Sequence, residues 1–85
     1  MEKVSNVTFP GGKKVIAQTG DRLIATDQPI EDGGQGTAPS PFMLFLASLA
    51  TCAGYYALQF CLSRSIATNG MSCKAVFSFD EQLHR

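Results

Sequence analysis

The sequence predicts a small α+β protein in which an antiparallel sheet packs on one long, buried central helix, with elements in the order β-β-β-α-β. Three observations predict this fold. No charged residue occurs between Asp32 and Arg64. Short β-rich runs separated by glycine-containing turns occupy the chain before that stretch. After it, apolar and polar residues alternate from Met71 to Asp80, as expected for a strand with one core side and one wet side.

The helix is expected to begin at Ser40 and to run to the region of Arg64. The Ser40 hydroxyl accepts a hydrogen bond from the first turn, and Pro41 suits the first helical position, where no N–H is needed. Arg64 places a cation at the negative end of the helix dipole. About 24 residues at ~1.5 Å each give a rod of roughly 36 Å.

The first three strands are expected at residues 4–9, 13–18 and 22–26. The sequences Pro10-Gly11-Gly12 and Thr19-Gly20-Asp21 mark the turns between them, so the three strands form a meander. After the helix, Asn69-Gly70 is the strongest turn signal before the last strand. On that strand one side is expected to face the core: Met71, Cys73, Ala75, Phe77 and Phe79.

The length predicts a single domain spanning residues 1–85. A domain of this size has too few other residues to shield such an apolar helix from water. Its apolar residues lie on nearly all sides, as in helices at the centre of a protein core or inside a membrane. About sixty other residues are too few to cover such a helix, since a domain this small buries only ~60% of its unfolded surface. A homodimer is therefore expected on geometric grounds.

The bulk composition limits the possible functions. The formal net charge is zero and the charged residues are scattered, so the sequence shows no basic patch that would bind nucleic acid or an anionic membrane surface. Three cysteines without an apolar leader indicate reduced thiols in a cytoplasmic protein. The glycines at 33–36 fit no nucleotide fingerprint, and the cysteines have no zinc spacing; neither a cofactor nor a metal is expected.

A single membrane span is the alternative interpretation of the long helix, because twenty-odd uncharged residues meet the length criterion. Several polar side chains oppose it, with both tyrosines near the middle of the stretch rather than at its ends. The polar residues are Ser48, Thr51, Tyr55, Tyr56 and Gln59. The flanking strands also need a soluble core, so a soluble helix is preferred.

The stretch from Pro39 to Cys52, PSPFMLFLASLATC, resembles the helix signature of the OsmC/Ohr family of thiol-dependent hydroperoxide reductases. The lead-in Asp27-Gln28-Pro29 with Gly33-Gly34 resembles that family too. The similarity covers roughly residues 20 to 66. Its most specific features are the proline at the helix start, the small residues in the middle, and a cysteine eleven residues after Pro41.

This resemblance implies an intertwined homodimer whose central helices are wrapped by the sheets of both subunits. It implies that Cys52 is the thiol that attacks organic hydroperoxides, with an external dithiol as reductant. In the family an arginine held by a glutamate at the helix start supports the cysteine, but Phe42 and Met43 stand at those acidic positions. The basic residues considered as auxiliary groups are Lys13, Lys14 and Arg22.

The family's C-terminal half, with its resolving cysteine, is absent from these 85 residues. Cys61 is excluded as a substitute, because nine helical residues place it on the face opposite Cys52, about 13 Å along the axis. Cys73 is the only intrachain partner considered. Two alternatives stay open: a non-catalytic dimer of the same shape that binds a small ligand or partner, and a fragment of a longer domain.

Overall fold

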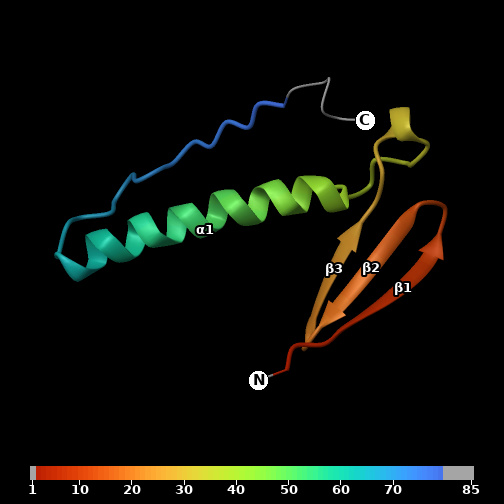
Figure 1. The fold of residues 1–85 in the computed structure, drawn as a ribbon, viewed down its shortest axis with the longest axis horizontal. Helices are drawn as coiled ribbons and strands as arrows, with labels where there is room; N and C mark the ends of the chain where they lie inside the picture. Colours follow the sequence, from red (N-terminus) through yellow and green to blue (C-terminus); the bar gives the residue numbers. More distant parts are fainter. Residues whose placement is uncertain (1, 80–85) are drawn as a thin grey trace. The chain divides into compact units, whose positions relative to one another are not determined.

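A computed structural model describes residues 2–79 and divides the chain into two compact units, Met1–Leu44 and Phe45–Arg85. The element order is β1 (Ser5–Gly11), β2 (Lys14–Thr19), β3 (Arg22–Thr26), a 3-10 turn η1 (Ile30–Asp32) and helix α1 (Pro41–Ser63) (Figure 1). The small α+β class and the β-β-β-α order are confirmed.

The three strands form an antiparallel sheet in the order β1-β2-β3. Strand β2 pairs with β1 through Val7↔Ala17 and with β3 through Ala17↔Ile24. The register shifts between Thr8 and Gly11, so β1 continues through Pro10, where a turn was predicted. Proline is tolerated there because β1 is an edge strand and Pro10 lies at an irregularity that needs no ladder N–H.

The connection from Asp27 to Pro39 is organised around the Asp27 side chain, which is only 1% exposed. Its carboxylate accepts hydrogen bonds from the Gln28 N–H (2.7 Å), the Thr37 N–H (3.1 Å) and the Thr37 hydroxyl (2.7 Å). The Asp27 N–H donates to the Pro39 carbonyl (3.1 Å) and closes the ends of the connection. A loop of this length is therefore ordered by its own polar groups.

Helix α1 begins as predicted and ends in a well-defined motif. The Met43 N–H donates to the Ser40 hydroxyl oxygen (3.1 Å), which is the expected N-cap bond. At the other end the Ile66 N–H donates to the Cys61 carbonyl (2.9 Å) and the Ser65 N–H to the Leu62 carbonyl (3.2 Å). These two bonds form a Schellman motif, with Ser65 in the left-handed region at φ 56°.

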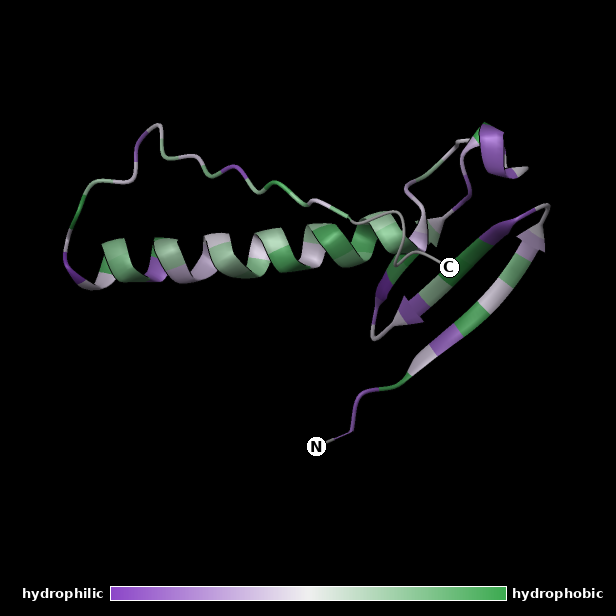
Figure 2. Ribbon diagram, turned by 45° about the horizontal axis from the view of Figure 1, so that its top comes forward, coloured by the Kyte–Doolittle hydropathy of each residue, from purple (hydrophilic) through white to green (hydrophobic). Residues whose placement is uncertain are grey.

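Two parts of the predicted fold are wrong for the single chain. Residues 71–79 are not a strand, and Asp80, the last residue of that predicted strand, lies outside the described residues. In Figures 1 and 2 this segment runs back alongside α1. A helix offers no free main-chain groups along its side, so no β-ladder forms. Helix α1, described over its whole length, also contains no buried residue.

Candidate functional site

Helix α1 has one side that the chain partly covers. The side chains of intermediate exposure beyond its first turn recur at spacings of three and four, and they therefore share one face. This half-buried face consists of Leu46, Ala50, Gly54, Ala57, Leu58 and Cys61. Most of these residues are small, and a Cβ added to Gly54 would meet no atom within 4 Å.

The segment that covers this face is the extended chain after the helix. A cavity of about 310 Å³ is lined by residues of both this segment and α1, and Cys73 is one of them. The cavity is lined by Gly54, Leu58, Thr68, Met71, Ser72 and Cys73. The segment has the alternating sides that the sequence predicts, since Phe77 is 38% exposed and its neighbour Val76 is 76% exposed.

Cys52 lies on the opposite side of the helix. With about 100° of rotation per residue, Ala50, Gly54 and Cys61 lie about 160–180° around the axis from Cys52. Cys52 is exposed, whereas Cys61 is of intermediate exposure. The side that carries Cys52, called here the Cys52 face, comprises Leu49, Cys52, Tyr56, Gln59 and Phe60.

The Cys52 face is apolar and largely open in the single chain. Leu49 is 47% exposed, Tyr56 68% and Phe60 52%. Figure 2 shows apolar residues recurring along the length of α1. Soluble monomers rarely expose contiguous apolar surface of this kind.

The structure does not bring Cys52 and Cys73 together. Cys73 lies at the cavity beside Gly54 and Leu58, on the side of the helix away from Cys52, and all three cysteines are free thiols. The pairing of Cys52 with Cys73 considered from the sequence is therefore wrong for this structure. Cys61 lies on the half-buried face, together with the α1 residues that line the cavity. The sequence did not lead us to predict this shared face. The spacing of Ala50, Gly54, Ala57 and Cys61 was the available signal.

The three basic residues considered as auxiliary groups belong to the first unit. Lys13 lies against the connection, because a Cβ added to Gly33 would be 3.3 Å from its Cε and Nζ atoms. Lys14 begins β2 and is partly buried. Arg22 begins β3 and forms an ion pair with Asp21 (3.8 Å), in which both side chains are more than four-fifths exposed. Such an exposed pair adds little stability.

The second unit supplies a cation of its own at the end of α1. The Arg64 guanidinium carbon lies 3.9 Å from the centre of the Phe60 ring, and Phe60 belongs to the Cys52 face. The Tyr55 and Tyr56 rings meet edge to face at 5.8 Å. Both arrangements are typical favourable contacts of aromatic rings. They show that this end of the Cys52 face combines aromatic surface with a positive group.

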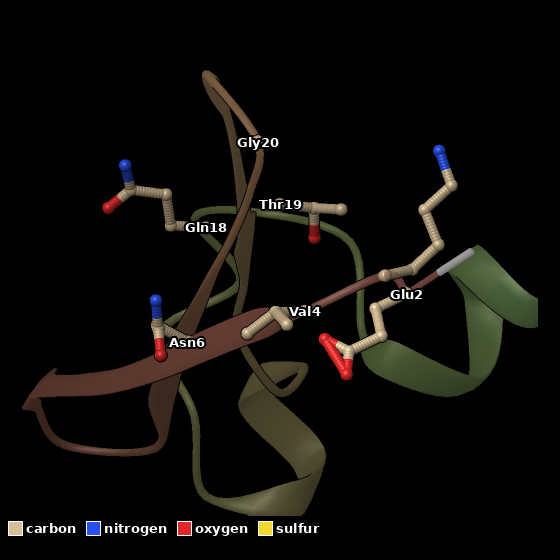
Figure 3. A pocket seen from close by; sticks show the side chains of 7 residues that line it. Glu2, Val4, Asn6, Gln18, Thr19 and Gly20 are labelled. Atoms are coloured by element: carbon tan, nitrogen blue, oxygen red, sulfur yellow. The ribbon is translucent and has the colours of Figure 1, made fainter.

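Two other cavities lie in the first unit and contain none of the predicted site residues. One of about 550 Å³ lies at the end of the sheet (Figure 3), where Asn6 and Gln18 are cross-strand neighbours. The other, of about 320 Å³, lies where the connection meets the helix start. It is lined by Pro29, Gly36, Ala38, Pro39, Ser40 and Met43. Within residues 2–79, no three His, Cys, Asp or Glu side chains gather in a way that could hold a metal ion.

Comparison with known proteins identifies no relative: no protein-family model, no curated protein and no solved structure matches the chain. The resemblance of residues 20–66 to the OsmC/Ohr family therefore stays a prediction from the sequence. Among the described residues, α1 also meets the length and composition criteria for a membrane span.

Proposed function

We propose that the protein reduces organic hydroperoxides at Cys52, as one subunit of a cytoplasmic homodimer, with an external dithiol as reductant. The observation that carries this proposal is the placement of Cys52. It follows Pro41 by eleven residues, as in the OsmC/Ohr family signature, and it lies on an exposed face of α1.

A second copy of the chain is the proposed cover for the Cys52 face. Residues 66–79 return along the half-buried face, so the chain's own extended segment is engaged on the side away from Cys52. Leu49, Tyr56 and Phe60 are each about half exposed or more. Burying apolar surface contributes about 25 cal/mol per Å², which gives two such helices a strong reason to associate.

The proposed reaction begins with the Cys52 thiolate attacking the terminal oxygen of the hydroperoxide. The O–O bond breaks, the alkoxide leaves and takes a proton to become an alcohol, and Cys52 becomes a sulfenic acid. One thiol of the dithiol then condenses with the sulfenic acid and releases water, giving a mixed disulfide. The second thiol displaces Cys52, which returns to its thiol while the reductant becomes a cyclic disulfide.

The positions of the other cysteines support an external reductant. Cys61 lies about 180° around the helix from Cys52, and Cys73 lines the cavity on that same far side. A disulfide requires Cα atoms within about 7 Å, so a resolving thiol must approach Cys52 from outside the helix. A dithiol of small size meets this requirement.

A positive group is needed near Cys52, because the thiolate and not the thiol is the nucleophile. The candidates in this proposal are Lys13, Lys14 and Arg22, supplied by either subunit of the dimer. A lysine provides charge but not the planar fork with which an arginine binds two oxygens. Each of them is replaced in turn by Met or Gln, and the pH needed to alkylate Cys52 is measured. Only the replacement of the residue that faces the sulfur is expected to raise this pH.

The test uses the three cysteines as matched variants. Cys52→Ser is expected to abolish consumption of an alkyl hydroperoxide with a dithiol, while Cys61→Ser and Cys73→Ser keep it. Consumption unchanged by Cys52→Ser would disprove the catalytic assignment. Leu49→Lys on the Cys52 face is expected to convert the dimer to monomer in size-exclusion chromatography. The control for added charge is Thr51→Lys, because Thr51 is exposed and lies about 160° around the helix from Leu49.

A non-catalytic dimer is the second candidate, favoured by Phe42 and Met43 at the positions of the family's acidic residues. Alkylation of Cys52 separates the two candidates. A thiol that reacts only above pH ~8 behaves as an ordinary cysteine and supports the non-catalytic protein.

A single membrane span is the third candidate, favoured by the uncharged 23-residue helix without a buried residue. Retention of the chain in the aqueous fraction without detergent would exclude it.

A further inference from the structure

An exposed turn connects the end of helix α1 to the segment that carries Cys73. The Met71 N–H donates to the Thr68 carbonyl (3.0 Å), so Asn69 and Gly70 occupy the two central positions of the turn. Both residues are exposed, and Gly70 has φ 73°. A Cβ added to Gly70 would meet no atom within 4 Å. Nothing in the described chain therefore shields this peptide unit.

We propose that Asn69 is a site of spontaneous chemical modification, in which the chain deamidates itself through its own main chain. The Gly70 nitrogen attacks the Asn69 Cγ atom, a C–N bond forms, and the Cγ–Nδ2 bond breaks. Ammonia leaves with the proton of the Gly70 N–H, and a five-membered succinimide remains. Water then opens the ring at either carbonyl and gives aspartate or isoaspartate. No oxidation or reduction takes place, and solvent water is the only other reactant.

The local structure favours this reaction at Asn69 in two ways. Glycine lacks a Cβ, so no side chain hinders the approach of its nitrogen to the amide carbon. Within residues 2–79, no hydrogen bond restrains the Gly70 N–H or the Asn69 side chain, and the peptide between them is at the surface. Asparagine is among the least durable residues chemically, and here it has little protection.

Two other sites in the chain provide internal comparisons. Asn6, the only other asparagine, precedes the β-branched Val7 within strand β1, where it pairs with Gln18. A branched side chain and a fixed ladder both hinder ring closure. Asp32 precedes Gly33 and could form the same ring, but the Gly33 N–H donates to the Ile30 carbonyl (3.0 Å). The reaction is therefore expected at Asn69 and not at Asn6 or Asp32.

The modification would alter the neighbouring cavity. Either product replaces a neutral amide by a carboxylate next to Thr68, and isoaspartate also adds a methylene to the main chain of the turn. Thr68, Met71, Ser72 and Cys73 line the cavity of about 310 Å³ beside α1. A longer turn displaces these residues relative to Gly54 and Leu58. This inference does not depend on the proposed peroxidase activity.

The test follows the folded chain during incubation at mildly alkaline pH and physiological temperature. Peptide mapping by mass spectrometry measures the amide-to-acid exchange, and an isoaspartate-specific methyltransferase labels the rearranged product. Progressive loss of the amide at Asn69, with Asn6 intact, is the expected result, and the rate should rise with pH as the Gly70 nitrogen loses its proton more readily.

Asn69→Gln is the matched variant, because glutamine keeps the amide but must close a larger ring. It is expected to remove both the mass change and the methyltransferase label. The proposal is overturned if Asn69 in the folded chain loses its amide no faster than Asn6. It is also overturned if Asn69 reacts only after unfolding in urea, since the turn would then protect the amide.

Discussion

The connection from Asp27 to Pro39 is polar and satisfies its own hydrogen bonds, whereas helix α1, which follows it in the chain, is apolar and open. Asp27 is 1% exposed and accepts three hydrogen bonds from Gln28 and Thr37. In α1 no residue is buried, and Tyr56 is 68% exposed. Asp27 is therefore the most enclosed side chain among residues 2–79, and the predicted core helix is not enclosed.

This difference shows which forces can act within a chain of this size. The hydrogen bonds of this connection join residues within 27–39, so these bonds need no other part of the protein. An apolar helix gains most of its stability from surfaces that exclude water, and these surfaces come from segments outside the helix. The connection satisfies its polar groups within one chain, whereas α1 has no buried residue there.

The largest contrast is expected from replacing one glycine in each region by alanine. In Gly34→Ala the new Cβ would overlap the main-chain carbonyl of Gln28, so we expect a loss of about 3 kcal/mol in the free energy of unfolding. In Gly54→Ala the Cβ meets nothing within 4 Å, and we expect a gain of about 0.5–1 kcal/mol, because alanine favours the helix.

Urea unfolding followed by circular dichroism measures both variants. Equal and small effects at the two glycines would mean that the connection is as loose as the open helix, and the contrast between the regions would fail.

The second contrast concerns pH and is specific to the connection. The Thr37 hydroxyl is the main cause that holds the pKa of Asp27 below its ordinary 3.8; burial acts in the opposite direction, and the N–H groups of Thr37, Gln28 and Gln35 assist the hydroxyl. Because the pKa is lower in the folded state, the carboxylate contributes stability above pH 3.8 that is lost as the pH falls through the folded pKa.

Unfolding in urea at a series of acid pH values measures this loss. The variant Asp27→Asn should be less stable than the wild type at neutral pH and should lose less stability on acidification. Thr37→Val should reduce the acid dependence in part. A wild-type acid dependence that Asp27→Asn leaves intact would contradict the role of this carboxylate.

The smallest expected difference in stability is between two glycine variants at the C-terminal end of α1. Ser65 has φ 56°, a conformation that costs a non-glycine residue about 1–2 kcal/mol. Ser65→Gly is expected to stabilise the helix end by about 1 kcal/mol. Ser63→Gly, two residues earlier and within the helix, should destabilise it by a smaller amount. Thermal unfolding of both variants measures the signs, and two variants of the same sign would contradict the assigned helix end.

Residues close together in the sequence made the local elements predictable. Ser40 and Pro41 indicated the start of α1, and the Ser40 cap is present at 3.1 Å. The strands β1 to β3 and the turn at Asn69-Gly70 were likewise predicted, because turn chemistry and alternation are local signals. The extension of β1 through Pro10 was missed, since a register shift depends on the partner strand.

The candidate site was predictable only in part. The spacing from Pro41 to Cys52 placed the thiol on the helix, and the geometry of nine helical residues correctly separated it from Cys61. Which face of α1 the following segment would cover was not predictable, because both faces are apolar. The prediction of a fourth strand failed for the same reason: alternation defines two sides of a segment but not its neighbour.

The sequence by itself determined three strands, an apolar helix from Pro41 and the rotation that separates its cysteines, because propensity, capping and helical periodicity act between nearby residues. Only the tertiary structure decided that Asp27 is the enclosed side chain, that residues 66–79 cover the Cys61 side of the helix, and that the Cys52 face stays open. Those outcomes depend on which surfaces meet, and contact between distant segments is set by the packing of the whole chain.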